Sequence, residues 1–288
     1  MRILVMGGTQ FNGLALVREL SSTGHDVTIV NRGKSEAVVP TWVRRLIADR
    51  TDADQMRSVL GGEDFDAVVD VSAYLPSDVE LMVEIFKGRI AHYVFVSSTV
   101  IYGTSDLLPI TENHPVDRTP HQNEYGRNKI LCEDILFREH RENGFPASVV
   151  ALSMVFGPNN ILPDREQRMF QRFIQGREIL IPGAGRTLQQ FGHVDDQARA
   201  LRMVLGQPVT FGQRYTLTGK DYFSQEGYVD VFSEVLGKEA RKRFIPADLM
   251  EDLWHGRVEV SLPQVQSAAD TRGREKPNPI LVNRFMLS

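Results

Sequence analysis

The sequence has a single cysteine, Cys132, in 288 residues. One thiol excludes an intramolecular disulfide and suits a reducing compartment, so we expect a cytoplasmic protein. Seven histidines and one cysteine are also too sparse for a structural zinc site. We therefore expect no bound metal.

Long apolar runs and an excess of positive charge are absent too. The apolar stretches fall well short of the roughly 18 residues that cross a bilayer, and the first of them leads straight into glycines rather than into a signal-peptide cleavage site. A net charge of -4 and a pI near 6.0 give no electrostatic footprint for nucleic acid. The sequence thus predicts a small-molecule substrate and disfavours membranes and nucleic acid as partners.

A glycine-rich turn follows the first apolar run. Residues 2–6 have the length of a strand, residues 14–20 have helical spacing of apolar side chains, and residues 26–30 resemble a second strand. Strand, glycine turn, helix and strand in about thirty residues are typical of a dinucleotide fingerprint. A tight turn without a ligand is the alternative, because Gln10 occupies the place of the middle glycine. The residues expected to contact the cofactor are Gly7, Thr9, Gln10, Phe11, Asn12 and Gly13.

The end of the second strand bears on the choice of nicotinamide cofactor. An acidic residue there favours NAD, whereas an arginine suits the 2′-phosphate of NADP. This chain has Asn31 and Arg32 followed by Gly33 and Lys34, with no carboxylate. The cofactor is therefore NAD(P), with a preference for NADP, unless Arg32 is only a solvated turn residue.

The alternation of strands and helices predicts an α/β, Rossmann-like, doubly wound parallel sheet. Further strands are expected at 43–48, 65–71, 91–97 and 147–152, and helices at 52–60, 77–87 and 125–142. We predict a dinucleotide-binding domain over residues 1–157 and a smaller, partly helical substrate-binding region over 158–288, with the chain re-entering the first domain around 190–205. The expected elements of the second region are helices 166–176, 194–205 and 225–236, strands 178–181 and 214–218, and a solvated segment at 271–279.

Tyr125 and Lys129 lie four residues apart in a predicted helix, so their side chains share one face. An ammonium beside a phenol favours the phenolate and is expected to lower the tyrosine pKa from roughly 10. Ser98, at the end of a strand, faces the same sheet edge as the glycine turn. The three residues predict the acid–base half of a hydride-transfer site, and a surface helical pair is the alternative.

Together these residues resemble an extended short-chain dehydrogenase/reductase of the NAD-dependent epimerase/dehydratase type. The matching positions are Gly7-Gly8-Thr9, Phe11, Gly13, Asp49, Val96-Ser97-Ser98, Tyr102-Gly103, Tyr125, Lys129, Gly157-Pro158 and His193-Val194-Asp195-Asp196. The glycine turn with Gln10 is closer to an atypical branch that includes the chloroplast stem-loop-binding proteins, which are linked to RNA.

The resemblance implies roles for these positions. Ser98 and Tyr125 would act on the substrate, with Tyr125 as acid and base, and Lys129 would hold the nicotinamide ribose. Asp49 would accept from the adenine amino group, and Arg50 beside it is also expected to contact the cofactor. The turn of Val71, Ser72 and Ala73 would pass beneath the cofactor. Family members also commonly form homodimers.

Departures from the family pattern concern the substrate. Thr99 and Val100 stand where 4,6-dehydratases carry Asp-Glu, which disfavours that elimination. Gln189 and Ala151 replace arginines that often hold a nucleotide diphosphate. The residues expected near the substrate are Thr99, Gln189 and Arg186, with Arg165 and Arg168 as further replacements for the missing arginines.

The sequence therefore predicts an NAD(P)-dependent epimerase or ketoreductase that acts on a sugar-like substrate, possibly a nucleotide sugar. The alternative is a catalytically weak member that binds RNA or protein and senses a dinucleotide. The joint presence of Ser98, Tyr125 and Lys129 favours the enzyme.

Overall fold

The computed structural model describes residues 1–35, 37–103, 105, 108–161 and 166–249. The predicted segment 271–279 and Arg165 lie outside this part. The chain forms two compact units, one from Met1–Ile161 and Phe191–Gly219, the other from Leu162–Gln190 and Lys220–Ser288. Of the second unit, residues 166–190 and 220–249 are described.

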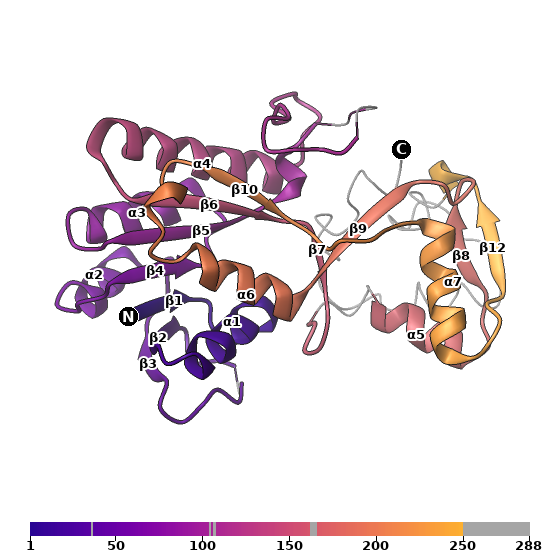
Figure 1. The fold of residues 1–288 in the computed structure, drawn as a ribbon, viewed down its shortest axis with the longest axis horizontal. Helices are drawn as coiled ribbons and strands as arrows, with labels where there is room; N and C mark the ends of the chain where they lie inside the picture. Colours follow the sequence, from indigo (N-terminus) through magenta and orange to yellow (C-terminus); the bar gives the residue numbers. More distant parts are fainter. Residues whose placement is uncertain (36, 104, 106–107, 162–165, 250–288) are drawn as a thin grey trace. The chain divides into compact units, whose positions relative to one another are not determined.

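A seven-stranded parallel sheet forms the centre of the first unit (Figure 1). Its order, β3-β2-β1-β4-β5-β6-β10, contains the strand order of a doubly wound dinucleotide-binding sheet, so that prediction is confirmed. The seventh strand, β10, comes from a segment that the sequence pattern places in the smaller region. The strands are β1 (Arg2–Met6), β2 (Asp26–Asn31), β3 (Arg44–Ile47), β4 (Ala67–Asp70), β5 (His92–Ser98), β6 (Ala147–Leu152) and β10 (Arg214–Leu217).

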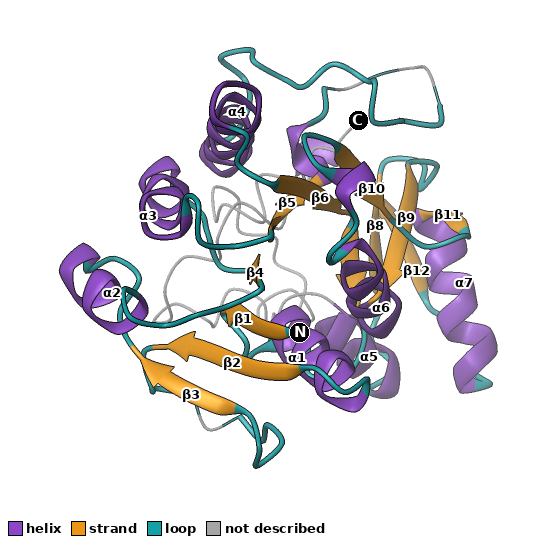
Figure 2. Cartoon of the chain, turned by 60° about the vertical axis from the view of Figure 1, so that its left-hand side comes forward, coloured by secondary structure: helices purple, strands orange, loops and turns teal. Residues whose placement is uncertain are grey.

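Helices cover both faces of this sheet, α2, α3 and α4 on one face and α1 and α6 on the other (Figures 1 and 2). They are α1 (Phe11–Ser22), α2 (Ala53–Leu60), α3 (Pro76–Phe86), α4 (Glu124–Asn143) and α6 (Val194–Val204). Two short 3₁₀ turns, η1 (Thr99–Ile101) and η2 (Pro208–Thr210), complete the regular structure of this unit outside its strands.

Side chains of each central strand alternate between two apolar cores. In β1, Ile3 and Val5 join the core under α1 and α6, whereas Leu4 and Met6 join the core under α2, α3 and α4. Strands buried on both faces are largely apolar, as in the Ala147–Leu152 run, where Ser148 is the one polar residue. This is why the apolar runs of the sequence predict parallel strands.

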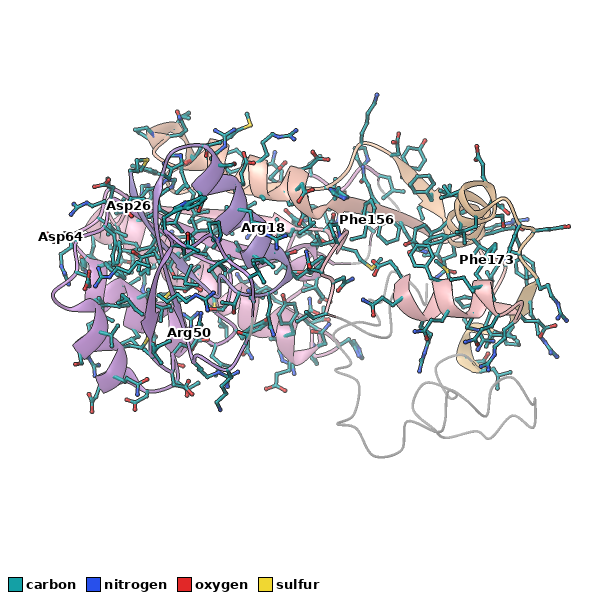
Figure 3. All side chains as sticks on the ribbon, turned by 90° about the horizontal axis from the view of Figure 1, so that it is seen from below. Arg18, Asp26, Arg50, Asp64, Phe156 and Phe173 are labelled. Atoms are coloured by element: carbon teal, nitrogen blue, oxygen red, sulfur yellow. The ribbon has the colours of Figure 1, made fainter. Side chains whose placement is uncertain are left out.

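The second unit pairs β8 (Ile179–Pro182) with β12 (Lys242–Ile245) and packs α5 (Glu166–Ile174) and α7 (Gln225–Leu236) around an apolar cluster that includes Phe173 (Figure 3). β9 (Leu188–His193) runs from this unit into the first. Its first half pairs with β11 (Tyr222–Ser224) and its second half with β7 (Met154–Phe156). Among the described residues, no helix is long and apolar enough to cross a membrane.

Candidate active site

The candidate site lies at the carboxyl edge of the central sheet. All seven strands are parallel, so the residues after β1, β4 and β5 emerge at one edge. The topology reverses between β1 and β4, and this is the place where such sheets bind ligands. The glycine turn, the turn at 71–73 and Ser98 are thereby brought to the same edge.

The glycine turn brings backbone segments too close for side chains. Gly7 has a positive φ of 87°, and a Cβ on it would lie 2.7 Å from the Cβ of Ser72. A Cβ on Gly13 would lie 2.0 Å from the carbonyl oxygen of Gly7. The turn therefore requires glycine at both positions, as a close phosphate cradle does.

The remaining residues of the turn leave polar groups available to a ligand. Gln10 and Phe11 begin α1, which has no side-chain cap, and the N–H groups of such a helix start favour an anion. Asn12 has a buried side-chain oxygen without a hydrogen-bond partner, whereas Thr9 contacts the hydroxyl of Ser35 at 2.8 Å. A cradle with no room for a side chain at Gly7 or Gly13, and with an unsatisfied buried oxygen on Asn12, fits a dinucleotide.

Cations and one carboxylate gather beyond β2 and β3. Asn31 accepts a hydrogen bond from the Gly33 amide at 2.8 Å, and Arg32 is exposed. The amide and hydroxyl of Thr51 hold the pKa of Asp49 below its ordinary value, with a smaller contribution from Arg32 and Lys34. Asp49 therefore lies near both cations.

Arg50 pairs with groups inside the protein, and its expected contact with the cofactor stays a prediction. Its guanidinium forms a bidentate ion pair with Asp70 at 2.8 Å and donates to the Ser72 hydroxyl at 2.7 Å. Asp70 is fully buried and also accepts from Tyr93. Arg50 thus links the end of β4 to the turn at 71–73 through Asp70 and Ser72.

Lys129 is 2% exposed and holds the same turn from the other side. Its ammonium donates to the carbonyl oxygens of Ala73 and Val96, both at 2.8 Å. It lies 4.6, 5.2 and 5.6 Å from the ring centroids of Phe95, Tyr74 and Tyr125. Burial lowers the pKa of Lys129 to about 8, because an apolar surrounding penalises the charge.

Tyr125 lies beside Ser98, but its phenol is not activated as the sequence predicts. A hydrogen bond joins the two hydroxyls. Burial nevertheless raises the pKa of Tyr125 above its ordinary value, and Tyr74 raises it further. The predicted lowering of the Tyr125 pKa is therefore wrong. The Lys129 ammonium donates to two carbonyls instead, and burial of the phenol outweighs the effect of the lysine charge.

Sequence reasoning missed the residues that hold Tyr125 in place. Asn123 caps α4 by accepting from the Gly126 amide at 2.8 Å. The buried Gln122 donates to the carbonyl of Val100, and a Cβ on Gly126 would lie 2.5 Å from its side chain. An Asn before a helical run is a recognisable cap, but nothing local reveals the link from Gln122 to η1.

Tyr74 is a further residue that the sequence did not single out. Its ring is 53% exposed and its centroid lies 5.9 Å from that of Tyr125. Asp78 accepts from the Tyr74 amide at 2.8 Å and so fixes the start of α3. An exposed aromatic ring next to the proposed acid is available for contact with a substrate.

The predicted substrate residues are divided between the units. Thr99 follows Ser98 in the first unit and is half-buried. Gln189 and Arg186 belong to the second unit, where Gln189 is buried with an unpaired side-chain oxygen and Arg186 is exposed. Arg168 lies on α5 of the same unit.

Comparison with known proteins agrees with this geometry. The sequence model of the NAD dependent epimerase/dehydratase family matches residues 3–217, which is most of the chain. The chain is 30% identical over 251 residues to the 2'-dehydrokanamycin reductase of Streptomyces kanamyceticus, covering 86% of this chain and 70% of that protein.

Two further comparisons bear on function and fold. The chain is 33% identical over 239 residues to the chloroplast stem-loop binding protein of 41 kDa b from Arabidopsis thaliana, covering 78% of this chain and 61% of the relative. It thus spans less than two thirds of that protein's length. The fold matches that of UDP-glucuronic acid 4-epimerase from Bacillus cereus in complex with NAD, with a TM-score of 0.69, 20% identity and coverage of 85% and 86%.

Proposed function

The chain belongs to the NAD dependent epimerase/dehydratase family, and on that premise we propose that it reduces or epimerises a keto or hydroxyl group of a sugar-like substrate. A bound nicotinamide dinucleotide would supply or accept the hydride. The observation that carries the proposal is the convergence of Ser98, Tyr125 and Lys129 at the edge that also bears the glycine cradle.

The protonation state of Tyr125 favours reduction as the first step. Because burial raises its pKa, the phenol is neutral near neutral pH and can donate a proton. In this proposal the substrate carbonyl oxygen accepts hydrogen bonds from Ser98 and Tyr125, and takes the Tyr125 proton as hydride reaches the carbonyl carbon. An epimerase would first run this step in reverse, oxidising the hydroxyl, and would then reduce the resulting ketone on its other face.

The test is Tyr125→Phe, which keeps the ring and removes the proton. We expect turnover of a keto-sugar to fall by at least about 10²-fold, the usual scale of acid–base catalysis, with cofactor affinity nearly unchanged. Steady-state kinetics and cofactor titration measure the two effects. Tyr222→Phe, at an exposed position, is the control. Unchanged turnover in Tyr125→Phe would remove Tyr125 from the role of acid.

We propose that the cofactor is NAD(P), with NADP preferred. Arg32 and Lys34 follow β2, and the carboxylate nearest them is that of Asp49, on another strand's end. Arg32→Ala should weaken NADP binding by about tenfold, worth about 1.4 kcal/mol, and leave NAD binding unchanged. Calorimetric titration of both dinucleotides measures the ratio of the NADP and NAD affinities in the variant and in wild type. Equal losses for the two, or none, would contradict the preference.

The substrate class is a sugar or another polyhydroxylated ring, with Thr99 next to the reacting group. Gln189, Arg186 and Arg168 of the second unit stay predicted substrate contacts. The similar reductase and epimerase are named for 2'-dehydrokanamycin and UDP-glucuronic acid respectively. Thr99 and Val100 lack the acid and base of a 4,6-dehydratase, so elimination is disfavoured. The homodimer and the cytoplasmic location stay predictions.

An RNA- or protein-binding dinucleotide sensor is the second candidate, favoured by the similarity to a stem-loop binding protein. A net charge of -4 argues against it. Gel-shift titration with a stem-loop RNA at low and physiological salt distinguishes the sensor from the enzyme. Binding that survives physiological salt, without turnover of any keto-sugar, would favour the sensor.

A further inference from the structure

A buried ion pair lies two helical turns beyond Tyr125. Glu133, on α4, is 1% exposed. Ser97 of β5 donates to one of its carboxylate oxygens at 2.5 Å, and Arg214 of β10 donates to the other at 2.7 Å. One carboxylate therefore joins a helix to two strands of the central sheet.

The contacts of Glu133 continue those of the proposed site. Residues 125, 129 and 133 recur every four positions on one face of α4. They contact three consecutive residues of β5, since Tyr125 bonds to Ser98, Lys129 to the Val96 carbonyl and Glu133 to Ser97. The Glu133–Ser97 hydrogen bond is the third of these links, and its β5 residue, Ser97, is adjacent in sequence to Ser98, the partner of Tyr125.

The surroundings of the pair give it a fixed geometry. The Arg214 guanidinium lies 5.9 Å from the ring centroid of Tyr102 and 5.6 Å from that of Phe137. Burial raises the pKa of Glu133 above its ordinary value, and Arg214 and Ser97 oppose that rise. A buried ion pair adds little stability over an apolar pair of the same volume, so its effect is expected in positioning.

We propose that Glu133 and Arg214 are positioning residues that keep α4 in register with β5, and thereby keep the Tyr125 hydroxyl on that of Ser98. Neither residue contacts the reacting atoms. The proposal rests on the proposed function for its effect on turnover. Its effect on Tyr125 itself is independent of that function.

The first test is Glu133→Gln, which preserves volume and removes the charge. We expect turnover to fall by about tenfold or more, since small misplacements of reacting groups have large effects, with cofactor affinity within about twofold of wild type. Glu139→Gln is the matched control, because Glu139 is on the same helix and pairs with Lys87 at 3.0 Å near the surface. Wild-type turnover in Glu133→Gln would overturn the proposal.

A double variant, Glu133→Leu with Arg214→Leu, separates positioning from stability. Because the double variant leaves no unpaired buried charge, its melting temperature should be close to that of wild type, while its turnover stays low. Turnover restored together with the melting temperature would reduce the pair to a structural role and overturn the proposal.

The third measurement needs no turnover. In protein labelled with ¹³C at the tyrosine Cζ, the Tyr125 signal is assigned by its loss in Tyr125→Phe. We expect it to move in Glu133→Gln and to stay in place in Glu139→Gln. A stationary signal overturns the positioning claim. Absence of hydride transfer in the wild type, with a signal that moves, overturns only the proposed function.

Discussion

The ammonium of Lys129 is a buried charge that titrates close to neutrality. Two backbone carbonyls and three aromatic rings surround it, and burial lowers its pKa to about 8. A base with a lowered pKa is charged below that value and neutral above it. Its contribution to binding an anionic, hydroxyl-rich cofactor is therefore expected to depend on pH.

We predict that cofactor affinity falls as the pH rises through about 8, where the ammonium loses its proton. Lys129→Met should bind weakly at every pH and lose the step near that value. Fluorescence titration of the cofactor across this range measures both profiles. Lys238→Met, at an exposed position, should keep the wild-type step. A flat wild-type profile would show that the charge of Lys129 is not used in binding.

Single residues were predictable where chemistry depends on spacing along the chain. The Tyr125–Lys129 interval, the glycines and the strand-end position of Ser98 are local patterns. The pKa of Tyr125 was not predictable, because its direction depends on burial. The contacts of Arg50 with Asp70 and of Glu133 with Arg214 were missed for a related reason. They join residues 20 and 81 positions apart, and no local pattern records them.

At the scale of elements, the start of α1 is the part of the site with the least room. The carbonyl of Gly7 lies where a Cβ on Gly13 would be, so the helix rests directly on the turn. Gly62, after α2, has no atom within 4 Å of an added Cβ. The two glycines therefore offer a matched pair for substitution.

We predict that Gly13→Ala displaces α1 from the turn, weakens cofactor binding by at least about tenfold and costs about 1–3 kcal/mol of stability, as overpacking usually does. Gly62→Ala should change the free energy of unfolding by less than about 0.5 kcal/mol. Urea denaturation and cofactor titration of both variants measure these effects. Equal behaviour of the two would mean that the close approach is not needed.

Strands and helices were predictable in proportion to their length and burial. The six strands and the helices of the first 152 residues lie where the sequence places them, with ends that differ by at most three residues. β7, β9, β11 and β12 were missed, because they are only three to six residues long and all but β7 mix polar with apolar residues, as in the Leu188–His193 run. The alternation of apolar and polar residues that identifies a strand cannot be recognised over three to six such residues.

At the scale of the whole molecule, His92 connects parts of the chain that lie far apart in sequence. Its Nδ1 accepts from the Gly206 amide at 3.0 Å, and its Nε2 lies 2.8 Å from the hydroxyl of Ser148. Ser148 in turn donates to the carbonyl of Thr210 at 2.7 Å. The ring centroid of Phe211 lies 4.7 Å from that of His92. These neighbours are uncharged, and burial lowers the pKa of His92 to about 4.

We predict that this histidine makes the protein less stable in mild acid. Between its unfolded pKa of 6.5 and its folded value of about 4, the unfolded chain binds a proton that the folded chain does not, so stability falls as the pH falls. From pH 7 to pH 5 the loss is about 2 kcal/mol. Urea denaturation at the two pH values measures it. His92→Gln should lose this dependence and His121→Gln, at an exposed site, should keep it. Equal slopes in the two variants would contradict the assignment.

The segments that complete the central sheet have a consequence for synthesis. α6 and β10 belong to the first unit, yet they follow residues of the second unit in the chain. A nascent chain that ends near Gly157 has β6 without its neighbour β10 and α1 without α6. An open, largely apolar strand edge invites pairing with other chains. The ribosome must therefore release the chain beyond residue 217 before the dinucleotide-binding sheet can close, and until then β6 is the point at which aggregation is most expected.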